Sequence, residues 1–343
     1  MSELPVKLNT VDRLKGFART VLPASIYQRG SRCWQGFRWR SRSIAMRARL
    51  GAPEVLLYFG SAPGDDLLCT AVLRELHKRG KRNVWMMSNH QDLFAGNEQV
   101  ERVVPVDSFY QRYVNFWNRQ YWHLEYAAFD READRSTPPV RHVIAELCFR
   151  TGITGDVALR PYLFLTDEER ARFSWASKKI AIQSSGLAAR WPIKNKEWSP
   201  ERFQEVVDQL RAQFEFVQVG SLTDPPLTEV TDMRGRTSKR ETAAILANSL
   251  VFVGLEGFVM HLARAVECPA VIVLGGRTAP WQFGYSCNMN LYSPVPCAPC
   301  WLWNTCPHDR MCMKDISVAS VVEAIHSQLS KPRGPLAADY ATI

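Results

Sequence analysis

The stretch that decides the fold runs from Val251 to Gly276 and reads VFVGLEGFVMHLARAVECPAVIVLGG. An apolar strand leads to the polar pair Glu256-Gly257, a short apolar helix follows, and after Pro269 a second apolar strand begins. Strand, turn, helix and strand in this order form the repeating unit of a parallel α/β sheet. Such sheets bind nucleotides at the carboxyl ends of their strands, where the N–H groups of a helix start attract phosphate. The stretch therefore predicts a nucleotide site in which Glu256 accepts hydrogen bonds from a ribose or a base.

Elements of the same kind precede and follow this stretch. Apolar runs of strand length alternate with amphipathic helical segments on both sides of a polar segment at 166–170. The expected strands are at 55–59, 83–87, 103–106, 179–182 and 216–219, and the expected helices at 67–79, 201–214, 241–247 and 317–329. The segment 108–135, which is rich in Tyr, Trp and Arg, matches no single element. Two α/β halves with a cleft between them predict a donor site and an acceptor site on opposite walls.

The length of 343 residues fits two domains. The expected division is a basic extension at 1–50, a first Rossmann-like domain at 51–165, a second at 166–330 and a disordered tail at 331–343. Apolar residues make up 46% of the chain and charged residues 22%, as in a soluble globular protein. No apolar run is long enough to span a membrane, and the N-terminus shows no secretory signal. The sequence therefore predicts a cytoplasmic protein.

The net charge of +9 lies in the N-terminal extension. Residues 1–50 hold 11 basic and 2 acidic residues, whereas the other 293 residues hold 32 of each sign. Aromatic residues stand between the arginines, as in the segment from Trp34 to Arg42. This mixture suits an anionic membrane surface, with the rings at the headgroup boundary, and nucleic acid is a second candidate partner. A helix pair packed on the domain, with its arginines in solvent, is the alternative without a partner.

Two consecutive aspartates, Asp65 and Asp66, follow the first expected strand and the turn at 60–64. A carboxylate at this edge of the sheet faces any cleft between the two halves, which is the placement that a general base needs. Aspartate is also favoured at the N-cap of a helix. We expect one aspartate of the pair to cap the helix and the other to act as the general base.

A loop at 191–200 precedes the helix expected at 201–214 and contains Lys196. The loop follows the first strand of the second half, where α/β sheets bind phosphate. A lysine held there by a neighbouring tryptophan reaches a diphosphate as a point charge, whereas the alternative is a lysine in solvent. The position favours phosphate binding by Lys196, with Ser184 and Ser185 after the strand as further contacts.

Four cysteines lie within a short segment near the C-terminus, with His308 between the last two. They are Cys297, Cys300, Cys306 and Cys312, in the spacing C-x2-C-x5-C-x5-C. Four soft ligands suit a structural zinc ion, although the spacing lacks the second C-x2-C pair of common zinc modules. Reduced cysteines packed in the interior are one alternative, and disulfides, which a reducing cytosol disfavours, are the other.

Four segments in this order resemble glycosyltransferase family 9, the ADP-heptose:lipopolysaccharide heptosyltransferases and their relatives. The first is GSAPGDDLLCTAVLRELHKRG, which begins at Gly60, and the second is NKEWSPERF, which begins at Asn195. The third is GLEGFVMHLARAVECPAVIVLGG, from Gly254, and the fourth is CAPCWLWNTCPHDRMCMKDIS, from Cys297. The resemblance covers residues 54–329.

The resemblance implies a GT-B fold, in which two Rossmann-like domains face a cleft, and an inverting, metal-independent transfer from a nucleotide sugar. It places the base of the family at Asp65 and the phosphate-contacting lysine at Lys196. The acidic nucleotide contact falls on Glu256, with Gly257 after it, and the helix-start histidine falls on His261.

Two positions depart from the family pattern. Asp66 stands where an apolar residue is usual, and Phe258 stands where the family has a second glycine. A bulky side chain at Phe258 narrows the approach of a donor to the backbone, which puts the identity of the donor in doubt. The basic extension at 1–50 is not part of the family core.

The function that follows is a cytoplasmic glycosyltransferase, peripheral on the inner face of the membrane through residues 1–50. The first domain is expected to bind a glycan or glycolipid acceptor, such as a lipopolysaccharide core. The second is expected to bind a nucleotide sugar, for which the resemblance favours an ADP-sugar carrying heptose or another hexose-like sugar. Catalysis requires no cofactor, and nucleic acid is not an expected partner. Two other functions stay open: a non-catalytic GT-B-like nucleotide-binding protein, and a zinc-bearing nucleic-acid binder.

Overall fold

The computed structural model describes residues 24–60, 62–332 and 334–343, and the chain forms two compact units, Met1–Ala52 and Pro53–Ile343. In the first unit, the described residues form the helix α2 (Ala24–Leu50), which contains no proline and no acidic residue. Trp34, Phe37 and Ile44 are 48%, 63% and 56% exposed and share one face of this helix. Among the described residues, no helix combines the length and apolarity that crossing a bilayer requires.

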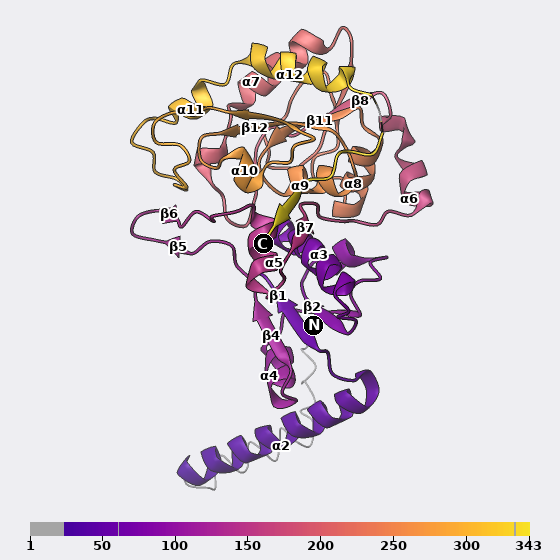
Figure 1. The fold of residues 1–343 in the computed structure, drawn as a ribbon, viewed down its shortest axis with the longest axis vertical. Coiled ribbons are helices and arrows are strands. Elements are labelled where there is room, and N and C mark those ends of the chain that lie inside the picture. Colours follow the sequence, from indigo (N-terminus) through magenta and orange to yellow (C-terminus); the bar gives the residue numbers. More distant parts are fainter. Residues whose placement is uncertain (1–23, 61, 333) are drawn as a thin grey trace, which may run out of the picture. The chain divides into compact units, whose positions relative to one another are not determined.

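The second unit begins with a four-stranded parallel sheet in the order β3-β2-β1-β4 (Figure 1). Its strands are β1 (Val55–Tyr58), β2 (Val84–Met87), β3 (Arg102–Val104) and β4 (Gln120–His123). Helix α3 (Pro63–Lys78) connects β1 to β2 and begins at Pro63, whose fixed φ suits the first turn of a helix. The segment that matched no single element contains α4 (Ser108–Phe116), β4 and the start of a hairpin.

A six-stranded parallel sheet follows, in the order β10-β9-β8-β11-β12-β13. Counted along the chain this order is 3-2-1-4-5-6, that of a Rossmann fold. The strands are β8 (Lys179–Ile182), β9 (Glu215–Gln218), β10 (Thr231–Asp232), β11 (Val251–Leu255), β12 (Ala270–Gly275) and β13 (Met289–Tyr292). The two Rossmann-like halves that the sequence predicts are therefore present.

Helices cover both faces of the six-stranded sheet (Figure 1). On one face α7 (Pro200–Leu210) and α12 (Val318–Ser330) pack with Val251 and Val253, and on the other α8 (Lys239–Asn248) and α9 (Phe258–Ala265) pack with Phe252. Both faces of β11 are buried because successive side chains of a strand point to opposite faces. This explains why the strand is a continuous apolar run instead of an alternating one.

Two connections join the halves. The hairpin of β5 (Phe129–Asp130) and β6 (Arg135–Ser136) extends from the first half, and Arg135 forms a β-bridge with Leu302 of the second half. The C-terminal strand β14 (Tyr340–Thr342) returns to pair antiparallel with β7 (Asp156–Ala158). The tail at 331–343 was expected to be disordered, and this expectation is wrong for its end, because backbone pairing with β7 orders it.

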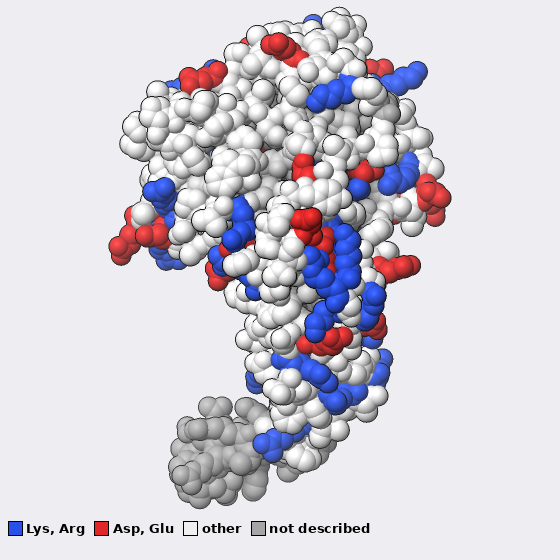
Figure 2. Space-filling view, in the orientation of Figure 1, with Lys and Arg blue, Asp and Glu red and all other residues white. Residues whose placement is uncertain are grey.

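The remaining short elements are α5 (Val143–Arg150), α6 (Asp167–Arg172), α10 (Pro280–Phe283) and α11 (Met311–Lys314), with 3-10 turns at Gln91–Phe94, Ser174–Ala176 and Lys194–Lys196. On the face of the second unit that Figure 2 shows, basic and acidic side chains lie close together. This mixture agrees with the equal numbers of both signs beyond residue 50.

Candidate active site

A cavity of about 670 Å³ lies between the two halves of the second unit. Asp65 lines it from the first turn of α3, and Lys196, Glu256 and Arg277 line it from the second half. The strand order of the six-stranded sheet reverses between β8 and β11, and Glu256 directly follows β11. Ligands of open α/β sheets bind at such a switch point, so the cavity lies where the topology predicts a site. We call it the cleft below.

Asp65 is placed by the first turn of α3 and not by the N-cap, which is Ala62. Its carboxyl group faces the charges of the opposite half. Burial raises the pKa of Asp65 to about 7, the negative charges of Asp66 and Glu256 add to this, and Lys196 opposes it. A carboxylate with such a pKa is a good general base near neutral pH.

Asp66, the second aspartate, points into the interior of the first half. Its Oδ2 accepts a hydrogen bond of 2.5 Å from the Ser88 hydroxyl, and its side chain has no exposed surface. Burial raises the pKa of Asp66 to about 6, while the hydrogen bond from Ser88 opposes the rise. Asp66 therefore joins α3 to the loop after β2, and neither aspartate caps the helix.

Lys196 and Glu256, which the sequence assigns to phosphate and nucleotide, lie together as an ion pair. The distance from Lys196 Nζ to Glu256 Oε2 is 2.6 Å, and both side chains are largely buried. Burial lowers the pKa of Lys196, which Glu256 opposes. Burial by itself raises the pKa of Glu256, but the charges of Lys196 and Arg277 lower it overall, so the carboxylate is ionised. The positive charge of Lys196 is thus balanced before any ligand binds.

Gly257 is the N-cap of α9 and lines the cleft, and His261 lies on the first turns of the same helix. The His261 ring is buried and its Nδ1 lies 2.7 Å from the Tyr285 hydroxyl. Burial lowers the pKa of His261 to about 3, so the ring is neutral. Phe258 also lines the cleft, and its Cα lies 3.6 Å from the position of a Cβ added to Gly64. The starts of α3 and α9 therefore meet in the cleft.

The two serines after β8 differ in their placement. Ser185 lines the cleft, and its hydroxyl donates a hydrogen bond of 2.8 Å to Glu197 Oε2. Glu197 also accepts from the backbone N–H of Gly186, which fixes the loop. Ser184 is buried, and its hydroxyl donates to the Pro225 carbonyl at 2.7 Å. Phosphate binding by both serines stays a prediction. Because the Ser184 hydroxyl already donates to Pro225, Ser184 would bind phosphate through its backbone N–H.

Arg277 is a cleft residue that the sequence reasoning missed. It follows β12 and the Gly275-Gly276 pair, at the same sheet edge as Glu256. The rule that singled out Glu256, namely a polar residue directly after a buried parallel strand, also applies to Arg277. The signal was therefore in the sequence.

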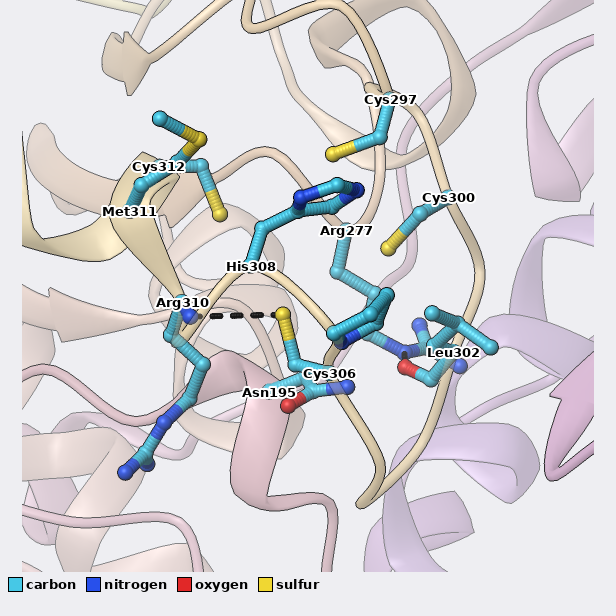
Figure 3. Close-up of a pocket in the computed structure, with 11 residues that line it drawn as sticks. Asn195, Arg277, Cys297, Cys300, Leu302, Cys306, His308, Arg310, Met311 and Cys312 are labelled. Carbon is cyan, nitrogen blue, oxygen red and sulfur yellow. Dashed lines mark hydrogen bonds between the residues drawn. The ribbon is translucent and has the colours of Figure 1, made fainter.

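Figure 3 shows the four cysteine side chains around a small cavity of about 70 Å³, together with His308. All four are free thiols, and burial raises the pKa of Cys300 and Cys312. Within residues 24–60, 62–332 and 334–343, no three His, Cys, Asp or Glu side chains are arranged so that they could hold one metal ion. The structural zinc predicted at Cys297, Cys300, Cys306 and Cys312 is therefore not supported.

Known proteins resemble this chain in structure but not detectably in sequence. No family model matches the sequence, and no curated protein matches it either. The structure of a family 9 glycosyl transferase from Veillonella parvula is similar with a TM-score of 0.59 and 15% identity, over 80% of this chain and 97% of that one. The ADP-heptose LPS heptosyltransferase II of E. coli gives a TM-score of 0.60 and 15% identity, over 80% of this chain and 98% of that one.

A third similar structure is the dodecameric, iron-containing heptosyltransferase TibC in complex with ADP-D-β-D-heptose. Its TM-score is 0.58 at 14% identity, over 81% of this chain and 78% of that one. Iron and zinc both accept cysteine thiolates as ligands. The thiols around the small cavity of this chain do not fit such a metal, since no three of the described candidate ligands are arranged to share an ion.

Each of these structures matches about four fifths of this chain. The fold class predicted from the sequence, GT-B, is confirmed by this similarity. The resemblance to glycosyltransferase family 9 is confirmed as well, at the level of the fold: the chain has the fold of the family 9 glycosyltransferases.

Proposed function

We propose that the protein is a glycosyltransferase that moves a sugar from a nucleotide sugar to a glycan acceptor, with Asp65 as the base. The observation that carries this proposal is the composition of the cleft. Asp65 comes from one half, with a pKa raised by burial to about 7, and Lys196 and Glu256 face it from the other half. A base on one wall and a phosphate-binding set on the other are what transfer between two bound substrates requires.

In the proposed reaction, Asp65 takes the proton of an acceptor hydroxyl while the oxygen attacks the anomeric carbon. The bond from this carbon to the diphosphate breaks, the electron pair leaves with the nucleoside diphosphate, and the configuration inverts. Lys196, Ser185 and the start of α9 line the cleft, and their positive charge and N–H and O–H donors would stabilise the leaving charge without a metal ion. Glu256 would bind the ribose or base after exchanging its contact with Lys196. An ADP-sugar is the favoured donor, as in the TibC complex.

The test of this proposal uses Asp65→Asn and the neighbouring control Asp66→Asn. After a thermal-shift screen of ADP-, UDP-, GDP- and CMP-sugars has identified the donor, release of the nucleoside diphosphate is measured with a lipopolysaccharide-core acceptor. We expect Asp65→Asn to lose activity about 10²- to 10⁴-fold and to bind the nucleotide as before, because only proton transfer is removed. Asp66→Asn should keep most activity, since its partner Ser88 lies away from the cleft. Full activity of Asp65→Asn would exclude Asp65 as the base.

One observation favours a non-catalytic nucleotide-binding protein instead. Phe258 lies at the start of α9 and places an aromatic ring in the cleft. If this ring keeps the acceptor out of the cleft, the wild-type protein binds the nucleotide sugar without turnover, and Phe258→Gly restores turnover. Turnover of the nucleotide sugar by the wild-type protein would show that the protein is an enzyme and would exclude the non-catalytic alternative.

We further propose that α2 brings the enzyme to an anionic membrane, where a lipid-linked acceptor lies. The exposed stripe of Trp34, Phe37 and Ile44 has Arg38 and Arg42 on one side and Arg40 and Arg47 on the other, and α2 carries no acidic residue. Rings at the headgroup boundary and arginines beside the lipid phosphates suit such a surface. Residues 1–23, which belong to the same predicted extension, lie outside the described residues.

The membrane proposal predicts loss of vesicle binding when the stripe is made polar. The triple variant Trp34→Ser, Phe37→Ser and Ile44→Ser should sediment several-fold less with vesicles that contain an anionic lipid. The matched control replaces Val140 and Leu222, which are 79% and 70% exposed in the second unit, by serine. This control should sediment as the wild type does. Equal sedimentation of the triple variant and the wild type would remove α2 from membrane binding.

A further inference from the structure

Arg277 is a buried arginine whose side chain is held from several directions. It follows β12, and only 3% of its surface is exposed. Its Nε donates a hydrogen bond of 2.9 Å to the Leu302 carbonyl, and the guanidinium carbon lies 5.2 Å from the ring centre of Trp301 and 5.9 Å from that of Trp303. Figure 3 shows the side chain passing the cysteine loop and ending beside Leu302. Arg277 is therefore a fixed group at the cleft and not a mobile surface cation.

The segment that holds Arg277 is itself fixed by the hairpin of the first half. Asp134 Oδ2 accepts hydrogen bonds of 2.7 Å from the backbone N–H groups of both Asn304 and Thr305. The Trp303 indole N–H donates to the Ser136 hydroxyl at 2.7 Å. Both halves thus contribute to the position of the guanidinium, which is a preorganised arrangement.

The charge of Arg277 has no counter-ion of its own. Among the described residues, no carboxylate lies within ion-pair distance of the guanidinium, and neither Nη1 nor Nη2 donates a hydrogen bond to the protein. Glu256 is the strongest charge near Arg277, but its carboxylate already pairs with Lys196 at 2.6 Å. A buried cation without a partner is unfavourable unless an anion completes the site.

The cations of the cleft therefore differ in what they offer to a ligand. Lys196 with Glu256 is a neutral pair in this structure, so an anion meets a net positive charge at this pair only after Glu256 has exchanged its contact for the nucleotide. Arg277 adds the surplus charge on the same wall of the cleft. Its guanidinium presents two parallel N–H groups, which match the two oxygens of a phosphate or a carboxylate better than a point charge does.

We propose that Arg277 binds an oxyanion of the substrate in the cleft, either a phosphate of the nucleotide sugar or the carboxylate of an acidic sugar. This inference rests on the proposed glycosyl transfer for the identity of the substrate, and on the buried, unpaired guanidinium for the site. Arg277 is a binding residue in this assignment, and Asp65 keeps the role of the base.

The test is calorimetric titration of the full chain with three probes: ADP, inorganic pyrophosphate and glucuronate. The variants are Arg277→Gln, which removes the charge, and Arg277→Lys, which keeps the charge but lacks the two parallel N–H groups of the guanidinium. The matched control is Arg310→Gln, because Arg310 is an exposed arginine of the cysteine loop that does not line the cleft. Thermal unfolding of each variant shows whether it is folded. If Arg277→Gln does not fold, the comparison of Arg277→Lys with the wild type decides.

We expect Arg277→Gln to weaken binding of at least one probe about ten- to a hundredfold, as for the loss of hydrogen bonds to a charged group. Arg277→Lys should weaken it less, by about threefold or more, and Arg310→Gln should leave it unchanged. A loss for both ADP and pyrophosphate identifies the donor diphosphate as the ligand. A loss for glucuronate alone identifies a sugar carboxylate.

The inference is overturned if folded Arg277 variants bind all three probes as the wild type does, or if the wild type binds none of them. Failure of this inference and failure of the proposed function give different results. Binding of ADP that does not depend on Arg277 removes the inference and leaves the transferase proposal intact. Arg277-dependent binding of pyrophosphate or glucuronate, without binding of any nucleotide sugar, supports the anion site and contradicts the transferase proposal.

Discussion

Asp65 combines two properties that a solvent-exposed aspartate lacks. It lies at the start of α3, facing the cleft, and burial raises its pKa from 3.8 to about 7. Between these two values the folded state holds the proton more tightly than the unfolded state does. The contribution of Asp65 to stability is therefore fully present at low pH and is lost as the pH rises through about 7. The ionised form of Asp65, which catalysis needs, is therefore the form that burial destabilises.

Opposite pH trends for activity and stability follow from this titration. The transfer rate of the wild type should rise about tenfold per pH unit below 7 and level off above it, because only the ionised carboxylate accepts the proton. Asp65→Asn cannot ionise, so its unfolding temperature should exceed that of the wild type at pH 8 and approach it at pH 4. The unfolding temperature should rise by roughly 2–4 °C for each kcal/mol that the ionised, buried carboxylate costs the wild type.

Calorimetric scans of the wild type and Asp65→Asn at pH 4, 6 and 8 measure this difference. Asp66 is present in both proteins, so the part of its titration that does not depend on the charge of Asp65 cancels in the comparison. An advantage of Asp65→Asn that is equal at all three pH values would mean that the pKa of Asp65 is not raised in the folded state.

The hairpin of β5 and β6 acts as an element that crosses from the first half to the second. Asp134 lies between its strands with φ of 47°, a left-handed conformation that Asn and Asp tolerate better than most residues. Its Oδ2 accepts from Asn304 N, Thr305 N and the Thr305 hydroxyl. Burial by itself would raise the pKa of Asp134, but these hydrogen bonds together outweigh it and lower the pKa. The hairpin places Phe129 4.4 Å, between ring centres, from Trp303 at the cleft.

Substitutions at Asp134 should separate its hydrogen bonds from its backbone conformation. Asp134→Ala loses all acceptors and strains the positive φ, and we expect a loss of about 1–3 kcal/mol in the free energy of unfolding. Asp134→Asn keeps an acceptor oxygen and the tolerance for this φ, so its loss should be smaller, and Asp134→Gly should remove only the acceptors. Denaturant unfolding gives the three values. If alanine and asparagine are equally stable, the contacts to Asn304 and Thr305 contribute nothing measurable.

At the scale of the whole molecule, the two halves are one folded unit and not two independent domains. Buried side chains from both halves form one continuous hydrophobic core, which includes Leu67 and Leu68 of α3 and Met260 of α9. The C-terminal segment closes this unit, because Leu159 N donates to Asp339 O at 2.7 Å and Gly155 N to Ile343 O at 2.7 Å. The buried Arg264 also donates to the Ala337 carbonyl at 2.9 Å.

Removal of residues 335–343 should therefore destabilise the second unit. The truncated protein loses β14 and leaves Arg264 without its acceptor, and we expect an unfolding temperature lower by roughly 4 °C or more. Tyr340→Ala is the control, since this side chain is 65% exposed and the pairing of the backbone remains. An unchanged unfolding temperature after truncation would show that the tail does not hold the halves together.

Local patterns predicted much of the fold and part of the site. Burial on both faces of a parallel sheet produces apolar runs, so the strands before Glu256 and after Pro269 were recognisable. The rule that ligands bind at the carboxyl ends of such strands singled out Asp65, Lys196 and Glu256, which the structure brings to one cleft. The four cysteines were also recognisable as a group, but spacing alone does not fix the geometry that a metal needs.

The sequence by itself determined the order of the α/β units and the type of residue at each strand end, because these follow from periodicity and chain connectivity. Only the tertiary structure decided how the charges combine. The pairing of Lys196 with Glu256, the unpaired state of Arg277 and the raised pKa of Asp65 depend on distances and burial between segments far apart in the chain. The return of β14 to β7 is of the same kind, because its partner lies 182 residues earlier at the closest pair of the register, Tyr340 with Ala158.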